Sequence, residues 1–269
     1  EPLTVEERYL KSIEAGVDQY GGESDPEYIV DLVNQGAISE TRIDESVRRI
    51  LRNKFDLGLF ETPFVDEAKV NALVNLPEYV SLGMTAQRNA VVLLDNESST
   101  LPLAAETRIF VDGLDPSVAA KYGMVVETPD EADVVLLFLN TVFNGNQPAG
   151  TDRTLDQMMA SRFPDTNLAF SEEILAKAAS YSDVSQLVTL VDLNRPAVLT
   201  ELNGMSDALV GTFGVSDEAM LDVVFGKHNP VGKLPFELPS SMAEVEAQLE
   251  DVPDDTANPL FPYGWGLSY

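Results

Sequence analysis

Carboxylates are the residues of this chain whose number and spacing are suited to chemistry. The sequence of 269 residues holds 45 aspartates and glutamates against 17 lysines and arginines, and it has no cysteine. A disulfide framework, a zinc–thiolate site and a cysteine nucleophile are therefore excluded. The one histidine, His228, cannot form a multi-histidine metal site. Acid–base and nucleophilic catalysis by carboxyl groups are the chemistry that remains.

Two loops place carboxylates where a site is expected. The first follows a predicted strand near the start of the sequence and carries four polar candidates: Asp18, Tyr20, Glu23 and Asp25. The second, residues 140–153 (NTVFNGNQPAGTDR), leaves the most hydrophobic predicted strand and ends in the pair Asp152–Arg153. Ligands bind at the carboxyl ends of strands in barrels and open α/β sheets. The pair either faces a ligand or forms a surface ion pair.

One glycine-containing segment resembles a phosphate-binding loop but fails its pattern. Residues 226–234 (GKHNPVGKL) have one residue too many between the glycines, and a leucine stands where the magnesium-binding hydroxyl belongs. A turn that enters a strand is the better interpretation. His228, beside Asn-Pro in this segment, is interpreted as a loop residue, and no Gly-x-Ser-x-Gly elbow accompanies it.

The charge of the chain restricts its partners. A net charge of −28 argues against binding to nucleic acid, whose phosphates favour lysine and arginine. The acids are dispersed, which indicates a solvated acidic surface rather than a disordered tail. No apolar run approaches the ~18 residues that a membrane-spanning helix needs. We therefore expect neither a nucleic acid nor a membrane as partner.

The first sixty residues predict a helix, a short strand and two further helices, over residues 4–15, 16–22, 24–36 and 39–55. Asp25 is the predicted cap of the second helix and Ser39 of the third. A strand followed by a functional loop and a helix is the repeating unit of a (β/α) barrel. One such unit cannot close a barrel alone. Residues 1–60 are therefore predicted to be the end of a barrel domain, and 61–77 a linker.

Residues 78–269 predict a second domain in which strands and helices alternate. After a helix over residues 77–89, the predicted strands cover residues 90–94, 108–111, 124–127, 133–139, 187–192 and 208–213, with 197–202 and 234–237 as further candidates. Helices are predicted over residues 116–122, 171–180 and 216–225. Continuous apolar strands indicate a sheet that is covered on both faces. The predicted fold class is α/β, a mostly parallel α/β sandwich that follows the last unit of a (β/α)8 barrel.

Several motifs resemble glycoside hydrolase family 3, in the family's order and over nearly the whole chain. The sequence AGVD (15–18) and ISETRIDESVRRILRNKFDLGLFETPFVD (38–66) resemble the end of its barrel domain. AQRNAVVLLDNESSTLPL (86–103) resembles the first strand of its second domain. GKLPFELPSSMAEVEAQLEDVPDD (232–255) and PLFPYGWGLSY (259–269) resemble its closing segment.

The resemblance implies an exo-acting, retaining β-glycosidase, most often a β-glucosidase, with its active site between the two domains. Such enzymes use two carboxyl groups ~5–5.5 Å apart, one as nucleophile and one as acid/base, and need no metal or organic cofactor. The family nucleophile is an aspartate in a Ser-Asp motif on the strand before AGVD, and no such motif precedes Asp18 here. We therefore expect this chain to be the C-terminal part of the enzyme and its partner to be the missing barrel portion.

The acid/base loop departs from the family pattern. Ala149 stands where many members have glutamate, and Asn144 stands where another subgroup has it. Asp152 is the nearest carboxylate and becomes the candidate catalytic residue. The candidate substrate-binding residues are Asp18, Tyr20, Glu23 and Arg153. The resemblance further implies a β-glucoside or β-linked oligosaccharide as substrate and a periplasmic or extracellular location.

Two other function classes stay open. The missing glutamate at position 149 motivates a carbohydrate-binding or structural module that has lost catalysis. A free-standing nucleotide-binding α/β domain is the third reading, and the lack of a glycine-rich loop after Leu94 or Val111 counts against it.

Overall fold

The computed structural model describes residues 3–21, 24–97, 99–141, 167–249 and 252–269. The chain divides into two compact units, Glu1–Asn75 and Leu76–Tyr269, which we call unit 1 and unit 2. Each unit is described by itself. In the part of the chain that is described, no helix combines the length and the apolar character needed to cross a membrane.

Unit 1 is helical, with α1 (Val5–Glu14), α2 (Glu27–Asn34), α3 (Glu40–Asp56) and α4 (Glu67–Leu73). The first three confirm the predicted helices, and α4 lies in the predicted linker. A capping box starts α1, where Thr4 and Glu7 satisfy each other's backbone N–H groups. Ser39 caps α3 through the Arg42 N–H as predicted. A small core joins these helices, made of Tyr9, Ile13, Leu32 and Ile38.

Two predictions for unit 1 are wrong. Residues 16–21 form no strand in the described structure, because strand pairing needs a hydrogen-bonding neighbour and none of the described segments supplies one. The predicted cap of α2 is also absent, since Pro26 occupies the N-cap position and no side chain caps the helix. Asp25 is therefore free of that structural role.

Unit 2 is built on a six-stranded sheet in the order β1-β6-β5-β4-β2-β3. All neighbours are parallel except β1, which pairs antiparallel with β6 at one edge. The strands confirm the six main predicted ones: β1 (Val92–Asp95), β2 (Arg108–Asp112), β3 (Met124–Val125), β4 (Val134–Asn140), β5 (Gln186–Asp192) and β6 (Ala208–Thr212). The predicted, mostly parallel α/β sandwich is confirmed.

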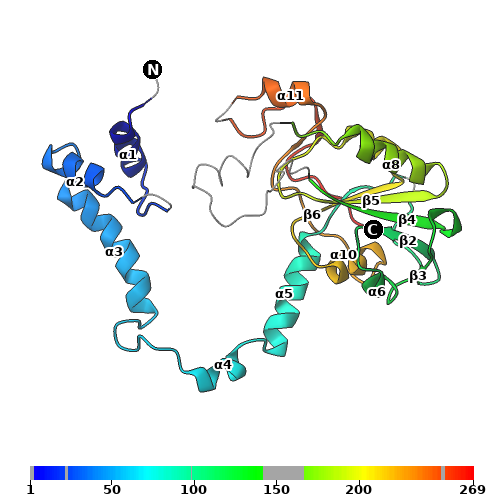
Figure 1. Cartoon of the computed structure of the whole chain (residues 1–269), viewed down its shortest axis with the longest axis horizontal. Helices are drawn as coiled ribbons and strands as arrows, with labels where there is room; N and C mark the ends of the chain where they lie inside the picture. Colours follow the sequence, from blue (N-terminus) through cyan, green and yellow to red (C-terminus); the bar gives the residue numbers. More distant parts are fainter. Residues whose placement is uncertain (1–2, 22–23, 98, 142–166, 250–251) are drawn as a thin grey trace. The chain divides into compact units, whose positions relative to one another are not determined.

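Helices cover both faces of the sheet, so the central strands are apolar on both sides (Figure 1). Along β4, Val134 and Leu136 belong to the core on one face, whereas Val135 and Leu137 belong to the core on the other. The helices of unit 2 are α5 (Pro77–Ala90), α6 (Pro116–Ala119), a 3₁₀ turn (Pro129–Glu131), α8 (Glu172–Ser182), α9 (Thr200–Met205), α10 (Asp217–Val224) and α11 (Met242–Ala247). Successive side chains of a strand point to opposite faces of the sheet. The position of a residue along its strand therefore determines whether it faces α10 or α8.

The two additional strand candidates are wrong. Residues 197–202 do not join the sheet as a strand. They pack against one of its faces, and α9 begins at Thr200. Residues 234–237 form no strand, and the short strand β7 (Leu238–Pro239) begins just after them and pairs with β8 (Pro259–Phe261). Pro235, Pro239 and Pro259 have no backbone N–H to donate, so the hydrogen-bonded pairing of these strands stays short.

The C-terminal segment closes the antiparallel edge of the sheet. The Leu267 N–H donates to the Leu93 carbonyl at 2.8 Å, and the indole N–H of Trp265 donates to the Leu94 carbonyl at 2.8 Å. Covering β1 in this way protects backbone groups that would otherwise be open to pairing with other chains.

Candidate functional site

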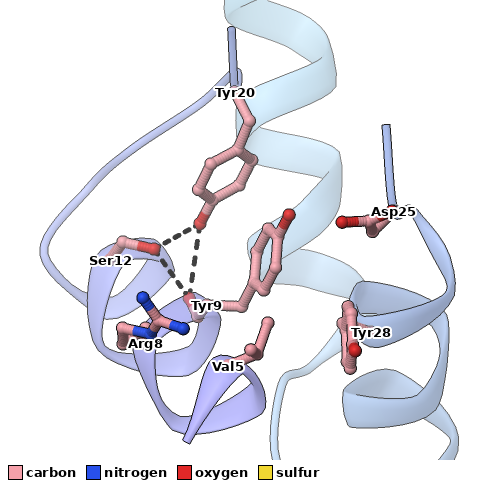
Figure 2. Close-up of a pocket in the computed structure, with 7 residues that line it drawn as sticks. All are labelled: Val5, Arg8, Tyr9, Ser12, Tyr20, Asp25 and Tyr28. Atoms are coloured by element: carbon pink, nitrogen blue, oxygen red, sulfur yellow. Dashed lines mark hydrogen bonds between the residues drawn. The ribbon is translucent and has the colours of Figure 1, made fainter. Parts of the chain in front are cut away.

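A tyrosine-lined pocket of about 380 Å³ lies in unit 1 (Figure 2). Its walls come from α1, from the segment that follows it and from the start of α2: Val5, Arg8, Tyr9, Ser12, Tyr20, Asp25 and Tyr28. Tyr20 is one of the residues predicted to bind substrate. The volume lies within the range of small-molecule sites.

The three tyrosines of this pocket form one aromatic cluster. The ring of Tyr9 lies edge-on to Tyr20 at 4.8 Å and stacks with Tyr28 at 5.6 Å between centroids. The Tyr20 hydroxyl donates to the Tyr9 carbonyl at 3.3 Å and also bonds the Ser12 hydroxyl. Tyr9 is buried, so the half-buried rings of Tyr20 and Tyr28 are the ones that offer flat apolar surface beside polar groups, which suits a sugar ring.

Asp18 lies outside this pocket and is tied to α3. Its Oδ1 accepts hydrogen bonds from the Ser46 hydroxyl at 2.7 Å and the Arg49 guanidinium at 2.9 Å, and Arg42 lies 3.9 Å away. The Ser46 hydrogen bond, with the two arginines, holds the pKa of the Asp18 carboxyl below its ordinary value of 3.8. These contacts give Asp18 a role in fastening the loop after α1 to α3.

In unit 2, polar side chains meet at the carboxyl ends of the parallel strands. Asn140, Asp192 and Thr212 are register neighbours on β4, β5 and β6. Asp192 is buried, and its carboxylate accepts from the Gly214 N–H at 2.6 Å and from Asn194 at 2.8 Å. Among the residues that the structure describes, the hydroxyl of the buried Thr141 finds no hydrogen-bond partner.

The second candidate loop leaves this edge of the sheet directly after Thr141. Asp152, Arg153, Ala149 and Asn144 lie outside the described residues, as does Glu23 in unit 1. The chain is described again from Asn167, whose carbonyl accepts from the Arg195 guanidinium at 2.6 Å. The structure therefore places both ends of the loop near the carboxyl edge.

A further polar group lies at the end of β2, the neighbour of β4 on its other side. Asp112 accepts from Lys177 at 3.0 Å and from the Tyr181 hydroxyl at 2.9 Å, both from α8. Burial, together with the bond to Asp112, raises the pKa of Tyr181 to about 12. After β2, the next strand, β3, adds to one side of it, and the strand after that, β4, adds to its other side. Open α/β sheets bind ligands at such a reversal, beside the carboxyl ends of the strands.

The comparison that decides the family covers more than half of the chain. The sequence model of the glycosyl hydrolase family 3 C-terminal domain matches residues 119–269. The chain belongs to glycosyl hydrolase family 3. This confirms the family that the motifs at 15–18, 38–66 and 86–103 resemble.

Relatives within family 3 match the chain from end to end. The chain is 43% identical to "Beta-glucosidase C" of Emericella nidulans, over all of this chain and 43% of that protein. It is 39% identical to "Periplasmic beta-glucosidase/beta-xylosidase" of Dickeya chrysanthemi, over all of this chain and 40% of that protein. The chain therefore spans about two fifths of the length of these relatives.

Solved structures share the fold at lower identity. A β-glucosidase from Listeria innocua in complex with isofagomine superposes with a TM-score of 0.68 and 24% identity, over 98% of this chain and 44% of that chain. A structure from Erythrobacter marinus gives a TM-score of 0.64 at 20% identity, over 98% of this chain and 45% of that chain. At this identity the likeness concerns the fold.

The pocket in unit 1 contains residues that sequence reasoning missed as site residues. Arg8, Tyr9 and Tyr28 sit on helices, where their spacing signals only an amphipathic face. Tyr9 and Tyr28 occupy positions on the apolar face of their helices, where any core residue would also stand. Asp25, one of the four polar candidates of the first loop, lines the pocket, although its position before Pro26 predicts a helix cap. Within the described residues, no group of three or more acids or histidines is arranged to hold a metal ion.

Proposed function

We propose that this chain is part of an exo-acting, retaining β-glycosidase that acts on β-glucosides or β-linked oligosaccharides. The observation that carries the proposal is the alignment of the whole chain, at about two fifths identity, with family 3 proteins named β-glucosidases. In this proposal residues 1–60 are the last unit of a (β/α) barrel, 61–77 a linker and 78–269 the α/β sandwich that completes the active site.

The chemistry requires two carboxyl groups on opposite sides of the glycosidic bond. The nucleophile, an aspartate, comes from the barrel portion outside these residues and forms a covalent glycosyl-aspartate. Asp152 acts as acid/base, since it follows the strand whose carboxyl end lies beside the polar groups of β5 and β6. Arg153 holds the substrate or orients Asp152.

The tyrosine pocket and its neighbours supply contacts to sugar. Tyr20 and Tyr28, whose rings pack against the buried Tyr9, offer apolar ring faces, and Asp25 offers a carboxylate to sugar hydroxyls. Glu23, close to Asp25 in sequence, adds a second carboxylate. Asp18 anchors this loop to α3 through its bonds to Ser46 and Arg49. It binds substrate only where a sugar hydroxyl reaches its carboxylate beside these two side chains.

The test compares the 269-residue chain with a reconstituted protein. The barrel portion of the Emericella nidulans relative is joined ahead of Glu1, and hydrolysis of an aryl β-glucoside is measured. We expect no turnover by the chain alone and turnover by the joined protein. Asp152→Ala is expected to lower kcat by about 10²–10⁴-fold, and added azide is expected to restore part of it.

The control variant is Asp130→Ala, an exposed acid on the 3₁₀ turn, which is expected to leave kcat unchanged. Turnover by the chain alone that Asp25→Ala abolishes would place the nucleophile within these residues and refute the assignment. Unchanged kcat in Asp152→Ala would remove Asp152 from the mechanism.

A carbohydrate-binding module that has lost catalysis is the second candidate, and the alanine at position 149 favours it. It predicts that the joined protein binds cellobiose in calorimetric titration but never cleaves it. We further propose export to the periplasm or the exterior of the cell, because two relatives are named periplasmic enzymes.

A further inference from the structure

Unit 2 contains a separate pocket of about 450 Å³, a volume typical of small-molecule sites. Its walls come from the loop after β5, from the segments around β7 and after α11, and from the C-terminal segment. We call it the Tyr263 pocket and define it by Pro196, Pro235, Glu237, Pro239, Gln248 and Tyr263.

A buried carboxylate faces this pocket. Glu237 is 8% exposed, and its Oε1 accepts from the Thr256 N–H at 2.8 Å and from the Gln248 amide at 3.1 Å. In the part of the chain that the structure describes, no cation pairs with Glu237 and no donor reaches its Oε2. The Oε2 atom is not among the buried polar atoms that lack a partner, so solvent reaches it, and a ligand hydroxyl can take the place of water there. The pocket therefore offers a fixed acceptor to a ligand's hydroxyl group.

An aromatic ring and a rigid frame complete the pocket. Tyr263 is 63% exposed, so its ring is available to a ligand that enters the pocket. Prolines at positions 196, 235, 239 and 253 fix the backbone of the walls. The Gln248 amide also donates to the Thr256 hydroxyl at 2.7 Å, which holds the wall segments together. A preformed site of this kind loses little freedom on binding.

We infer that the Tyr263 pocket binds a sugar ring of a β-linked oligosaccharide, with the ring stacked on Tyr263 and a hydroxyl donating to Glu237 Oε2. The choice of a sugar rests on the proposed function; the existence of a built site rests on the geometry. The Pro196 wall follows β5, so the pocket lies on the carboxyl-edge side of the sheet from which the Asp152 loop departs.

The experiment is a titration of the 269-residue chain with cellobiose, followed by the fluorescence of its single tryptophan, Trp265, which is two residues from Tyr263. We expect a saturable change. Tyr263→Ala removes the stacking surface and is expected to weaken binding by about tenfold. Glu237→Gln keeps an acceptor for Thr256 but removes the charge, and is expected to weaken binding by a similar factor.

Two controls fix the site. Tyr79→Ala removes an equally exposed tyrosine, 60% exposed on α5, and is expected to leave binding unchanged. Tyr28→Ala alters the pocket of unit 1, so it separates sugar bound there, which this variant weakens, from sugar bound at Tyr263, which it leaves unchanged. Because Tyr263 is exposed, circular dichroism of Tyr263→Ala should match the parent chain.

Three results would overturn the inference: no cellobiose binding, binding that survives both Tyr263→Ala and Glu237→Gln, or tighter binding of choline than of cellobiose, which would make it a cation site. Binding is measured without turnover. A joined protein that never hydrolyses a glucoside would therefore refute the proposed function and leave this site intact.

Discussion

At the scale of single residues, the acids divide into a solvated majority and a few that are held by donors. Asp192, Asp222 and Glu237 are buried, and each accepts at least two hydrogen bonds. A buried carboxylate is tolerated only with such compensation. Some donors are near in sequence, such as Asn194 to Asp192, whereas the donors to Asp222, Arg88 and Tyr122, are about a hundred residues away or more. Residue type alone therefore could not separate these acids from the rest.

Asp18→Asn is expected to destabilise unit 1, because the variant cannot pair with Arg49 and Arg42. The same contact predicts a pH dependence. Since the folded-state pKa of Asp18 is lowered, its stabilisation is complete above the unfolded value of about 3.9 and is lost as the pH falls through the folded value. The urea midpoint of unit 1, followed by circular dichroism, should fall more steeply below about pH 4 in the parent than in the variant. Parallel curves would contradict this role.

Asp192→Ala is expected to destabilise unit 2 by about 2–3 kcal/mol, because the Gly214 N–H and the Asn194 amide lose a charged acceptor in a buried place. Urea unfolding followed by Trp265 fluorescence measures it. Asp130→Ala, at an exposed position, is the matched control and should change the free energy of unfolding little. An unchanged midpoint in Asp192→Ala would show that the buried carboxylate is replaceable.

At the scale of elements, the strands of unit 2 were predictable because parallel strands that are buried on both faces have short, continuous apolar sequences. Residues 134–139 and 187–191 are of this kind, and their bounds shifted by one residue at most. The antiparallel pairing of β1 was not predictable, since its apolar run is equally compatible with either direction. The strand at 16–22 failed for the complementary reason: a local pattern cannot supply the neighbour that a strand requires.

The candidate site was predictable only where one loop carries it. Tyr20 lines the pocket of unit 1, but its contact with substrate stays a prediction, and the strand at 16–22 from which it was argued does not form. The Tyr263 pocket joins residues from 196 to 263, and only tertiary structure brings such segments together. Asp152 and Arg153 stay predictions, because they lie outside the described residues.

The docking of the C-terminal segment on β1 is an element-scale property with a sharp test. A Cβ on Gly266 would collide with the backbone oxygen of Gly232 and crowd Val92. Gly266→Ala is therefore expected to destabilise unit 2 by about 1–3 kcal/mol and to shift Trp265 emission to the red. Gly204→Ala, where the added Cβ meets nothing within 4 Å, is the control and should be neutral or slightly stabilising. Equal effects of the two substitutions would contradict the tight docking.

At the scale of the whole molecule, two surface properties compete. Unit 1 exposes large apolar side chains between α3 and α4, the largest fractions being those of Phe64 at 85% and Val65 at 79%. Apolar surface of this extent favours association. The net charge of −28 opposes association. It also lowers the stability of each folded unit, because folding brings like charges closer together.

The charge imbalance makes the stability of unit 2 depend on salt in a defined direction. Raising NaCl from about 0.01 M to about 1 M shortens the Debye length from about 30 Å to about 3 Å, so repulsion among exposed acids is screened. Exposed ion pairs such as Arg108–Asp133 weaken as well, but each contributes little to stability. The urea midpoint followed by Trp265 fluorescence should therefore rise with salt. Reversing the exposed Glu106 and Glu127 to lysine should flatten that rise, whereas a midpoint that falls with salt would mean that ion pairs outweigh repulsion.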